Sequence, residues 1–365
     1  MIPDHGIASA KEQDTTTRIT LTGDYYIGPG FSRPSREVIR RFIDERGFVV
    51  VNYEGSLRDG VGRRKAATLA MAEESLDLPP GCVLSLANNH ILDYGDDGLR
   101  RTLDAVTASG MTWFGLEHSR GAGDNYTIVD RNGCRICLAG FGWRNEECVQ
   151  ASRDRPGVVD FTKLNIDRLF ARLADERYDH LLVYVHAGYE FEYYPLPLHV
   201  GLSRYLIDRG ASLVYGSHSH CIQPYEVYAD RYIFYGLGNL VFSPSADDYP
   251  PVSDRGLIVS LLASPGRLVV EGVQRVQYER THSTLSVAPD HEFLEADRLS
   301  MRNLQTYGRS YAAVRRRKRN PRPIMQYDSP IANALKYQFW LGCARVTGYL
   351  GMRQVVKRML GWSAQ

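Results

Sequence analysis

Short apolar segments of strand length alternate with amphipathic helical segments along most of this 365-residue chain. This alternation is typical of an α/β fold, in which helices pack on the faces of a sheet. It predicts one core domain over residues 18–285. Strands are expected at Ile19–Thr22, Phe48–Val51, Val83–Leu86, Ile136–Ala139, Leu181–Val185, Leu213–Tyr215 and Tyr232–Tyr235. Helices are expected at Ser35–Arg46, Asp97–Ser109, Asn165–Arg177 and Leu198–Arg209.

The two ends of the chain differ from this core. Residues 1–17 form a polar leader without the apolar stretch of a signal peptide, and no apolar run reaches membrane-spanning length. We therefore expect a cytoplasmic protein. Residues 286–365 have a helical pattern, which predicts a C-terminal helical extension.

The extension carries a basic cluster at residues 315–319, followed by an aromatic-rich helical pattern. Two interpretations are open. Residues 312–362 would make peripheral contact with anionic lipid as an interfacial helix, or their apolar face would pack on the core as a helical hairpin. The 44 Lys and Arg residues nearly balance the 42 Asp and Glu residues, so the overall charge does not indicate nucleic acid as a partner.

Six cysteines are too few for a disulfide scaffold in a chain of this length. Cys134 and Cys137 form a C-x-x-C pair, but the pair lies in a strand pattern, whereas a redox pair is expected at the start of a helix. A zinc knuckle needs a second pair, which the sequence does not contain. Both cysteines are therefore expected to be buried in a strand.

Side chains of the kind that bind metals follow five of the predicted strands. In open α/β sheets, ligands bind beyond the carboxyl ends of the strands, so these side chains are expected to meet at one site. Taken singly, each has an ordinary explanation, such as a turn, a helix cap or a hydrogen-bonded loop. Five coincidences at equivalent strand ends favour a shared site. The residues are Asp24, Glu54, Asn88, Asn89, His90, His186, His218 and His220.

Imidazole together with carboxylate oxygen suits Mn²⁺, Fe²⁺ or Zn²⁺ better than Ca²⁺ or Mg²⁺. One bridging carboxylate with several terminal ligands suits two divalent ions about 3.5–4 Å apart, as in two-metal hydrolases. Such a pair lowers the pKa of a bridging water, so the nucleophile would be a metal-bound hydroxide. The sequence has no G-x-S-x-G or similar context for a serine or cysteine nucleophile.

Six motifs follow one another in a recognisable order: Gly23-Asp24, Asn52-x-Glu54, Ala87-Asn-Asn-His90 with Asp93-Tyr-Gly95, His186-x-Gly-x-Glu190, Gly216-x-His-x-His220, and Tyr235-Gly-Leu-Gly-Asn239. This order resembles that of the CapA family, the bacterial poly-γ-glutamate capsule synthesis proteins, within the calcineurin-like metallophosphatase superfamily. The resemblance covers residues 18–243. It implies a four-layer α/β/β/α sandwich and a dinuclear metal site.

Carried over position by position, the resemblance implies a role for each of these residues. Asp24 and His220 would hold one metal ion, and Glu54 would bridge both ions. The second ion would be held by Asn89, His186 and His218. His90 would be the acid that protonates the leaving group or holds the oxyanion. Supporting or substrate contacts are assigned to Asn52, Asn88, Glu190 and Asn239.

The chain departs from the family pattern at three motifs. The wider superfamily has a His two residues after the first Asp, where this chain has Tyr26, and CapA-like proteins also tend to lack that His. The usual His-Trp-Gly and Gly-His-His-Pro-His are His186-Ala-Gly188 and Gly216-Ser-His-Ser-His220 here. The ligands survive these changes, although one metal position has a ligand fewer. The departures therefore predict that the residues lining the substrate site, and so the substrate, differ from those of capsule-linked relatives.

Two other polar stretches have simpler explanations. Asp96 or Asp97 is expected to cap a helix that begins at Gly98. His199 lies at a predicted helix start and is expected to be a surface histidine.

The residues and the resemblance together predict a metal-dependent hydrolase-type enzyme. It would act on a phosphoester, or on a γ-glutamyl-type amide or acyl bond, in capsule, polyglutamate or peptide-metabolite biosynthesis. The substrate would be a small molecule or a polyglutamate-like chain. The alternative is a non-catalytic binding or scaffold subunit of a capsule polymer synthesis complex, with the same fold and a degenerate site.

Overall fold

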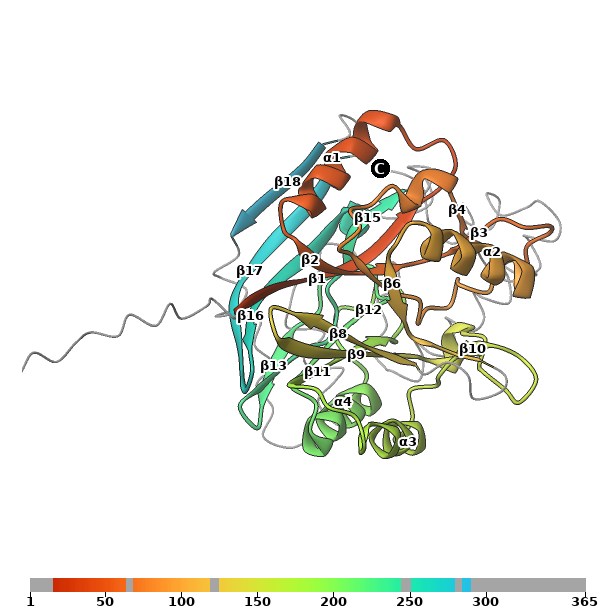
Figure 1. The fold of residues 1–365 in the computed structure, drawn as a ribbon. Helices are drawn as coiled ribbons and strands as arrows, with labels where there is room; N and C mark the ends of the chain where they lie inside the picture. The colour runs from red at the N-terminus through yellow and green to blue at the C-terminus, as the bar shows by residue number, and fades with distance from the viewer. Residues whose placement is uncertain (1–15, 64–67, 119–124, 244–250, 280–283, 290–365) are drawn as a thin grey trace, which may run out of the picture.

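A computed structural model describes residues 16–63, 68–118, 125–243, 251–279 and 284–289. Two large sheets form the centre of this part of the chain (Figure 1). The eight-stranded sheet has the strand order β18-β17-β16-β1-β2-β5-β6, with β15 paired to β1. Its strands are β1 (Thr17–Ile27), β2 (Phe48–Tyr53), β5 (Val83–Ser85), β6 (Thr112–Phe114), β15 (Asn239–Ser243), β16 (Arg255–Ser264), β17 (Arg267–Glu279) and β18 (Thr284–Pro289).

The six-stranded sheet has the order β13-β14-β12-β11-β9-β8. Its strands are β8 (Tyr126–Arg131), β9 (Cys134–Gly142), β11 (His180–His186), β12 (Leu213–Ser217), β13 (Tyr225–Tyr228) and β14 (Arg231–Phe234). Two short pairs lie apart from the large sheets: β3 (Ser56–Leu57) with β4 (Ala70–Met71), and β7 (Leu116–Glu117) with β10 (Gly157–Val158). The central strands β1, β2, β5 and β6 run parallel, as do β9, β11, β12 and β14.

Helices cover the outer face of each sheet (Figure 1). The helices α1 (Arg33–Asp44) and α2 (Gly95–Ala108) lie beside the larger sheet, and α3 (Lys163–Leu173) and α4 (Pro197–Arg209) lie beneath the smaller one. Short 3-10 helices complete the fold: η1 (Glu73–Leu76), η2 (Arg144–Glu146) and η3 (Pro251–Asp254). This is the four-layer α/β/β/α sandwich that the resemblance implies, and it confirms the predicted fold class.

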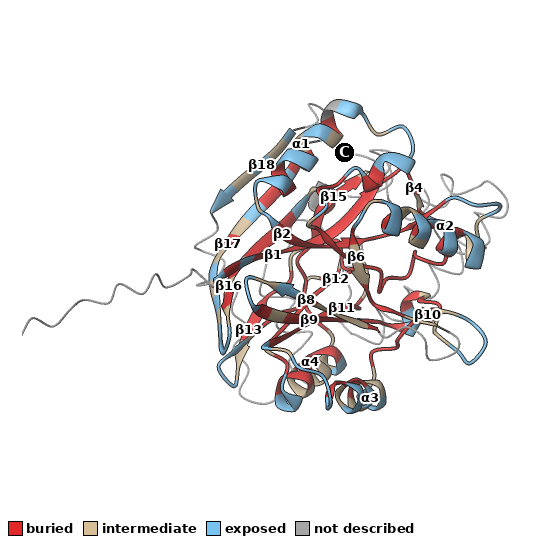
Figure 2. Ribbon diagram, in the orientation of Figure 1, coloured by how far each residue is buried: buried red, intermediate tan, exposed pale blue. Residues whose placement is uncertain are grey.

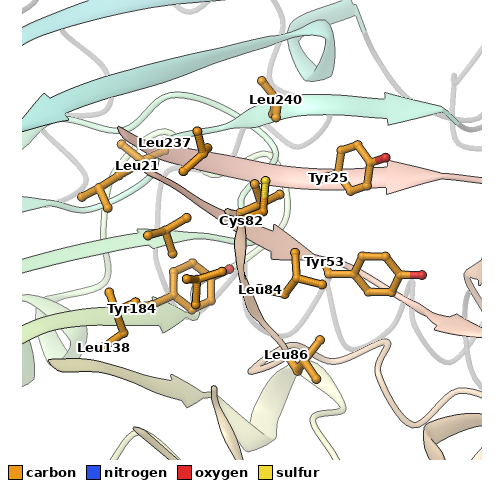
Figure 3. Close-up of a cluster of buried hydrophobic side chains, with 14 of the residues drawn as sticks. Leu21, Tyr25, Tyr53, Cys82, Leu84, Leu86, Leu138, Tyr184, Leu237 and Leu240 are labelled. Carbon is orange, nitrogen blue, oxygen red and sulfur yellow. The ribbon is translucent and has the colours of Figure 1, made fainter. Parts of the chain in front are cut away.

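The alternation of side chains along β11 shows how the layers are joined. Successive side chains of a strand point to opposite faces. Leu182 and Tyr184 belong to the cluster between the sheets, whereas Leu181 and Val183 pack in a second cluster with the helices. Figure 3 shows Tyr184 in the first cluster together with labelled leucines of both sheets. Because both faces of the central strands are covered, these strands are buried along their length (Figure 2).

Local sequence explains most helix boundaries. Ser32 caps α1 by accepting a hydrogen bond from Ser35 N, and Thr162 caps α3 in the same way. Helix α4 begins at Pro197 and ends before Gly210, which has a left-handed φ of 119°.

The prediction that Asp96 or Asp97 caps a helix beginning at Gly98 is wrong. Helix α2 begins at Gly95, and its N-cap residue is Tyr94, which makes no side-chain cap bond. The two aspartates lie in the first turn instead, where their negative charges interact favourably with the positive end of the helix dipole. The buried cysteines are confirmed, because Cys134 and Cys137 are both buried on β9, and neither forms a disulfide with another described cysteine.

The larger sheet extends to Pro289, past the core boundary predicted at residue 285. The rest of the predicted helical extension, including residues 312–362, lies outside the described residues, as does most of the polar leader. Membrane contact by the extension therefore stays a prediction. Among the described helices, none is both long and apolar enough to cross a membrane.

Three glycines bring backbones into close contact where β1, β15 and β16 meet. A Cβ on Gly23 would lie 1.9 Å from the carbonyl oxygen of Gly238, and a Cβ on Gly256 would lie 2.2 Å from the carbonyl oxygen of Asn239. Gly238 itself has a φ of 66°, which favours glycine. The positions of Asp24 and Asn239 therefore depend on backbone contact at this crossing.

We expect Gly23→Ala to lower the free energy of unfolding by about 2–3 kcal/mol, because the backbone must move to admit the methyl group. Chemical denaturation followed by circular dichroism measures the change. Gly272→Ala is the matched control, since a Cβ at that strand glycine meets no atom of a described residue within 4 Å. Its effect should stay within about 0.5 kcal/mol. Equal stabilities of the two variants would contradict the tight crossing.

Candidate metal centre

The carboxyl ends of strands from both sheets meet at one place. Asp24 lies at a register shift in β1, opposite Asn52 of β2 and Asn239 of β15. From the smaller sheet, His186 ends β11 opposite Ser217, the last residue of β12. The structure thus brings together side chains that lie up to about two hundred residues apart in the sequence.

Two groups of potential metal ligands share the Glu54 carboxylate. Within the described residues, Asp24, Glu54 and His220 form one group, and Glu54, His186 and His218 form the other. In each group the ligand atoms all lie within 4.8 Å of one another. All five side chains are fully buried. Binding of two cations by these groups, which the resemblance implies, stays a prediction.

The distances within the groups fit shared cations. Two ligand atoms that each lie about 2.0–2.2 Å from one ion are roughly 3–4 Å apart. His220 Nε2 lies 3.7 Å from Glu54 Oε1, and His186 Nε2 lies 3.8 Å from the same oxygen. Asn89 Oδ1 lies 2.9 Å from His186 Nε2, which places Asn89 beside the second group. The donor set and its spacing therefore suit divalent transition-metal ions.

Asn239 orients the His220 ring. Its amide nitrogen donates to the backbone oxygen of Ser253 at 2.6 Å, so its oxygen faces His220 Nδ1 at 3.0 Å. The Asp24 carboxylate lies 3.4 Å from the same Nδ1. With two oxygen acceptors beside it, Nδ1 carries the hydrogen, and Nε2 presents its lone pair towards Glu54.

Asn52 holds the carboxylates of Asp24 and Glu54 by hydrogen bonds, and Asn88 in turn holds Asn52. Asn52 Nδ2 donates to Asp24 Oδ1 at 2.7 Å and lies 3.4 Å from Glu54 Oε2. Asn88 Nδ2 donates to the Asn52 side-chain oxygen and to the Tyr53 backbone oxygen. These bonds fix the orientation of both carboxylates without occupying the Glu54 oxygen that faces the histidines.

His90 lies in the turn after β5, and its Nδ1 is 2.7 Å from Asp93 Oδ2. The same oxygen accepts a hydrogen bond from Leu69 N at 2.8 Å, so Asp93 is held as an acceptor. Both side chains are buried. Asp93 belongs to one of the sequence motifs, but no role was predicted for it. The spacing of three residues within one turn was the available signal.

Glu146 is a residue that sequence analysis missed. It is buried in η2, and its Oε2 lies 3.4 Å from His218 Nε2. Because η2 follows β9, a neighbour of β11, Glu146 obeys the same strand-end rule as the predicted residues. Glu146 lies four residues past Gly142, the last residue of β9, which is too far for the strand-end pattern to identify it.

Glu190 lies on the turn after β11 and is partly exposed. Burial acts to lower the pKa of His220, but contact with Asp24 and the charge of Glu190 raise it overall. A supporting or substrate contact by Glu190 stays a prediction. The neighbouring Phe191 packs its ring 5.9 Å from the His220 ring and has a left-handed φ of 59°.

The expectation that His199 lies at the surface is wrong. The ring is buried and packs edge-to-face on Trp143, with the ring centres 4.5 Å apart. It lies on the face of α4 that packs against the smaller sheet. Burial, and then the nearby His218, lower the pKa of His199 to about 3.

Burial and charge act in opposite directions on the central groups. Burial alone would raise the pKa of the Asp24 carboxyl, but the hydrogen bond and charge of His220 and the charge of His186 hold that pKa below its ordinary range. Burial lowers the pKa of His186, and His218 lowers it further. Burial also acts to lower the pKa of His220, but contact with Asp24 raises it overall.

Comparison with known proteins gives one family match. The model of a family described as "Bacterial capsule synthesis protein PGA_cap" matches residues 4–244. That range contains every residue of the two ligand groups.

Curated relatives match over a similar region. The capsule biosynthesis protein CapA of Bacillus anthracis is 28% identical over 194 residues, 52% of this chain and 46% of that protein. The PGA biosynthesis protein CapA of Bacillus subtilis is 32% identical over 164 residues, 44% of this chain and 42% of that protein. A probable polyglutamine synthesis accessory protein of Mycobacterium tuberculosis is 34% identical over 183 residues, 46% of this chain and 45% of that protein. Each match spans less than half of the relative.

Solved structures give more distant matches. A hypothetical protein from Thermus thermophilus aligns with a TM-score of 0.45 at 16% identity, covering 75% of this chain and all of that one. A 5′-nucleotidase precursor from the same organism also aligns with a TM-score of 0.45, at 14% identity, covering 82% of this chain and 60% of that one.

The depressed pKa of Asp24 predicts a pH dependence of stability in metal-free protein. A carboxyl whose pKa is lower in the folded state stabilises the fold above its ordinary pKa, about 3.9, and this contribution is lost as the pH falls below that value. Between about pH 4 and 2.5, we expect the wild type to lose up to about 1.4 kcal/mol per pH unit more than Asp24→Asn.

Urea unfolding in the presence of a chelator, repeated across this pH range, measures the difference. Asp97→Asn is the control, because it removes the same charge from an exposed position on α2. If Asp24→Asn and Asp97→Asn show the same slope, the Asp24 carboxylate does not stabilise the fold in this way.

Proposed function

Because this chain belongs to the bacterial capsule synthesis protein family PGA_cap, we propose that it is a metal-dependent hydrolase-type enzyme of capsule or polyglutamate metabolism. Its substrate is a phosphoester, or a γ-glutamyl-type amide or acyl compound, either as a small molecule or as a polyglutamate-like chain. The names of the curated relatives, which refer to capsule, PGA and polyglutamine synthesis, motivate this choice of substrate class.

One observation carries the proposal: two buried groups of ligands share the Glu54 carboxylate. Burying several carboxylates and imidazoles together is costly unless their charges are compensated. Two divalent cations would provide that compensation. A surface cluster of acidic residues would require no such explanation, but each of these five side chains is fully buried.

Asp24 and His220 would hold one cation, and Glu54 would bridge the two. The second cation would be held by Asn89, His186 and His218. The imidazoles favour Mn²⁺, Fe²⁺ or Zn²⁺. When bound, such a pair lowers the pKa of a water molecule and polarises the bond that is attacked.

The protein's own groups position this chemistry. Asn52 fixes the two carboxylates by hydrogen bonds, and Asn239 keeps the His220 lone pair directed at the centre. Asp93 accepts from His90 Nδ1, so that His90 Nε2 is the nitrogen that exchanges a proton with the substrate. In this role His90 protonates the leaving group or donates to a developing oxyanion.

A second candidate function is a non-catalytic binding or scaffold subunit of a capsule polymer synthesis complex, with the same fold and a degenerate site. The observation that favours it is the burial of the centre, whose two ligand groups consist of buried residues only: Asp24, Glu54, His186, His218 and His220. A substrate reaches these residues only if the surrounding side chains move. Activity measurements on metal-loaded protein separate the two functions.

We expect His186→Gln to lower the amount of bound divalent metal, because it removes a ligand from one group. Purified protein is loaded with Mn²⁺ or Zn²⁺, desalted and analysed by mass spectrometry for metal content. His180→Gln is a closely matched control, because His180 is buried at the other end of the same strand and contacts the Ser264 backbone oxygen. Equal metal content in the two variants, or no metal in the wild type, would argue against the centre.

We expect His90→Asn to reduce kcat by about 10²–10⁴-fold, since it removes a general acid, while the bound metal is retained. Turnover is measured on phenyl phosphate and on a γ-glutamyl anilide, whose leaving groups require protonation, with added Mn²⁺. His118→Asn is the control, because His118 contacts Trp113 and lies outside the two ligand groups. Metal-loaded wild type that turns over neither substrate would favour the non-catalytic subunit.

A further inference from the structure

A chain of side-chain hydrogen bonds lies beneath the candidate metal centre and connects its two ligand groups. Tyr184 lies on β11, two residues before His186, and its hydroxyl is 2.8 Å from His186 Nδ1. The same hydroxyl is 2.5 Å from Ser217 Oγ, and Ser217 donates to Asp24 Oδ1. All four side chains are buried, and Tyr184 lies in the cluster between the sheets (Figure 3).

The Asp24 carboxylate fixes the direction of these hydrogen bonds. Each of its oxygens already accepts from a neighbouring N–H group, so Asp24 acts as an acceptor towards Ser217. Ser217 has one hydrogen, which it donates to Asp24, and its oxygen therefore accepts from Tyr184. Tyr184 likewise donates its one hydrogen to Ser217, so its oxygen accepts from His186. The hydrogen of the His186 ring is then on Nδ1.

We propose that Tyr184 and Ser217 are positioning residues that hold His186 in the tautomer with an unprotonated Nε2. This inference rests on the proposed function, because an unprotonated Nε2 is the form that binds a metal ion. We name the pair the hydroxyl relay. The relay also joins the two groups of ligands, since it begins at Asp24 in one group and ends at His186 in the other.

The surroundings of Nε2 show why a relay is needed. Asn89 Oδ1 lies 2.9 Å from Nε2, a distance at which it would accept a hydrogen bond from a protonated Nε2. An acceptor is therefore available at either ring nitrogen of His186, and the acceptor at Nδ1 decides which nitrogen carries the hydrogen. Hydrogen bonds of this kind to metal-binding histidines typically change metal affinity by about 10–100-fold.

The test compares Tyr184→Phe with the wild type in metal-free, full-length protein labelled with ¹⁵N-histidine. Two-bond ¹H–¹⁵N correlation spectra report which ring nitrogen carries the hydrogen, and the His186 signal is identified by its loss in His186→Gln. We expect the hydrogen on Nδ1 in the wild type and on Nε2 in Tyr184→Phe. Mn²⁺ titration should show affinity about 10–100-fold weaker in the variant.

Tyr215→Phe is the matched control. Tyr215 lies on the adjacent strand β12, and its ring centre is 5.3 Å from that of Tyr184. Its buried hydroxyl makes no hydrogen bond within the part of the chain that the structure describes. The variant loses the same atom from the same layer and should keep the wild-type tautomer and Mn²⁺ affinity. A purely structural effect of losing a buried hydroxyl would appear equally in both variants.

Ser217→Ala provides a second route if Tyr184→Phe does not fold. With Ser217 Oγ removed, the Tyr184 hydroxyl donates to His186 Nδ1 instead, so the hydrogen should again move to Nε2. The relay is overturned if wild-type His186 carries its hydrogen on Nε2, or if Tyr184→Phe and Tyr215→Phe give the same tautomer. Failure of the wild type to bind Mn²⁺ would overturn the proposed function, whereas the tautomer measurement still decides the relay.

Discussion

The Asp24 carboxylate ties the two sheets together at the centre of the molecule. It belongs to β1 of the larger sheet, accepts from Asn52 of β2, and also accepts from Ser217 and the backbone of His218 in the smaller sheet. A carboxylate is stable in a buried position only when such donors surround it. Where β12 approaches β1, this acceptor therefore links the two sheets, in addition to the apolar cluster between them.

Much of the fold and centre could be predicted from sequence, because two regularities act over short ranges. Apolar runs of strand length marked β1, β2, β9, β11 and β12, and in parallel sheets the residues after such strands gather at one edge. Asp24, Glu54 and His186 were found by this rule. The resemblance to a known family then supplied the pairing of ligands, which spacing alone does not determine.

The features that could not be predicted depend on tertiary contacts, which the local sequence pattern does not reveal. Tyr184 has the pattern of any core tyrosine on a buried strand, and only its neighbours show what its hydroxyl contacts. Glu146 follows its strand after a turn of irregular length. His199 was predicted at the surface because it lies near a helix start, but the packing of α4 on the sheet turns that position inward.

The glycine crossing of β1, β15 and β16 has a consequence for how this protein can diverge. There, main-chain atoms of Gly238 and Asn239 meet the α-carbons of Gly23 and Gly256 directly, so few side chains take part in the contact. Asp24 and Asn239 are consequently held in place by contacts of the main chain, whose atoms are the same in every amino acid. A substitution in a neighbouring loop leaves these main-chain contacts unchanged, so Asp24 and Asn239 keep their places.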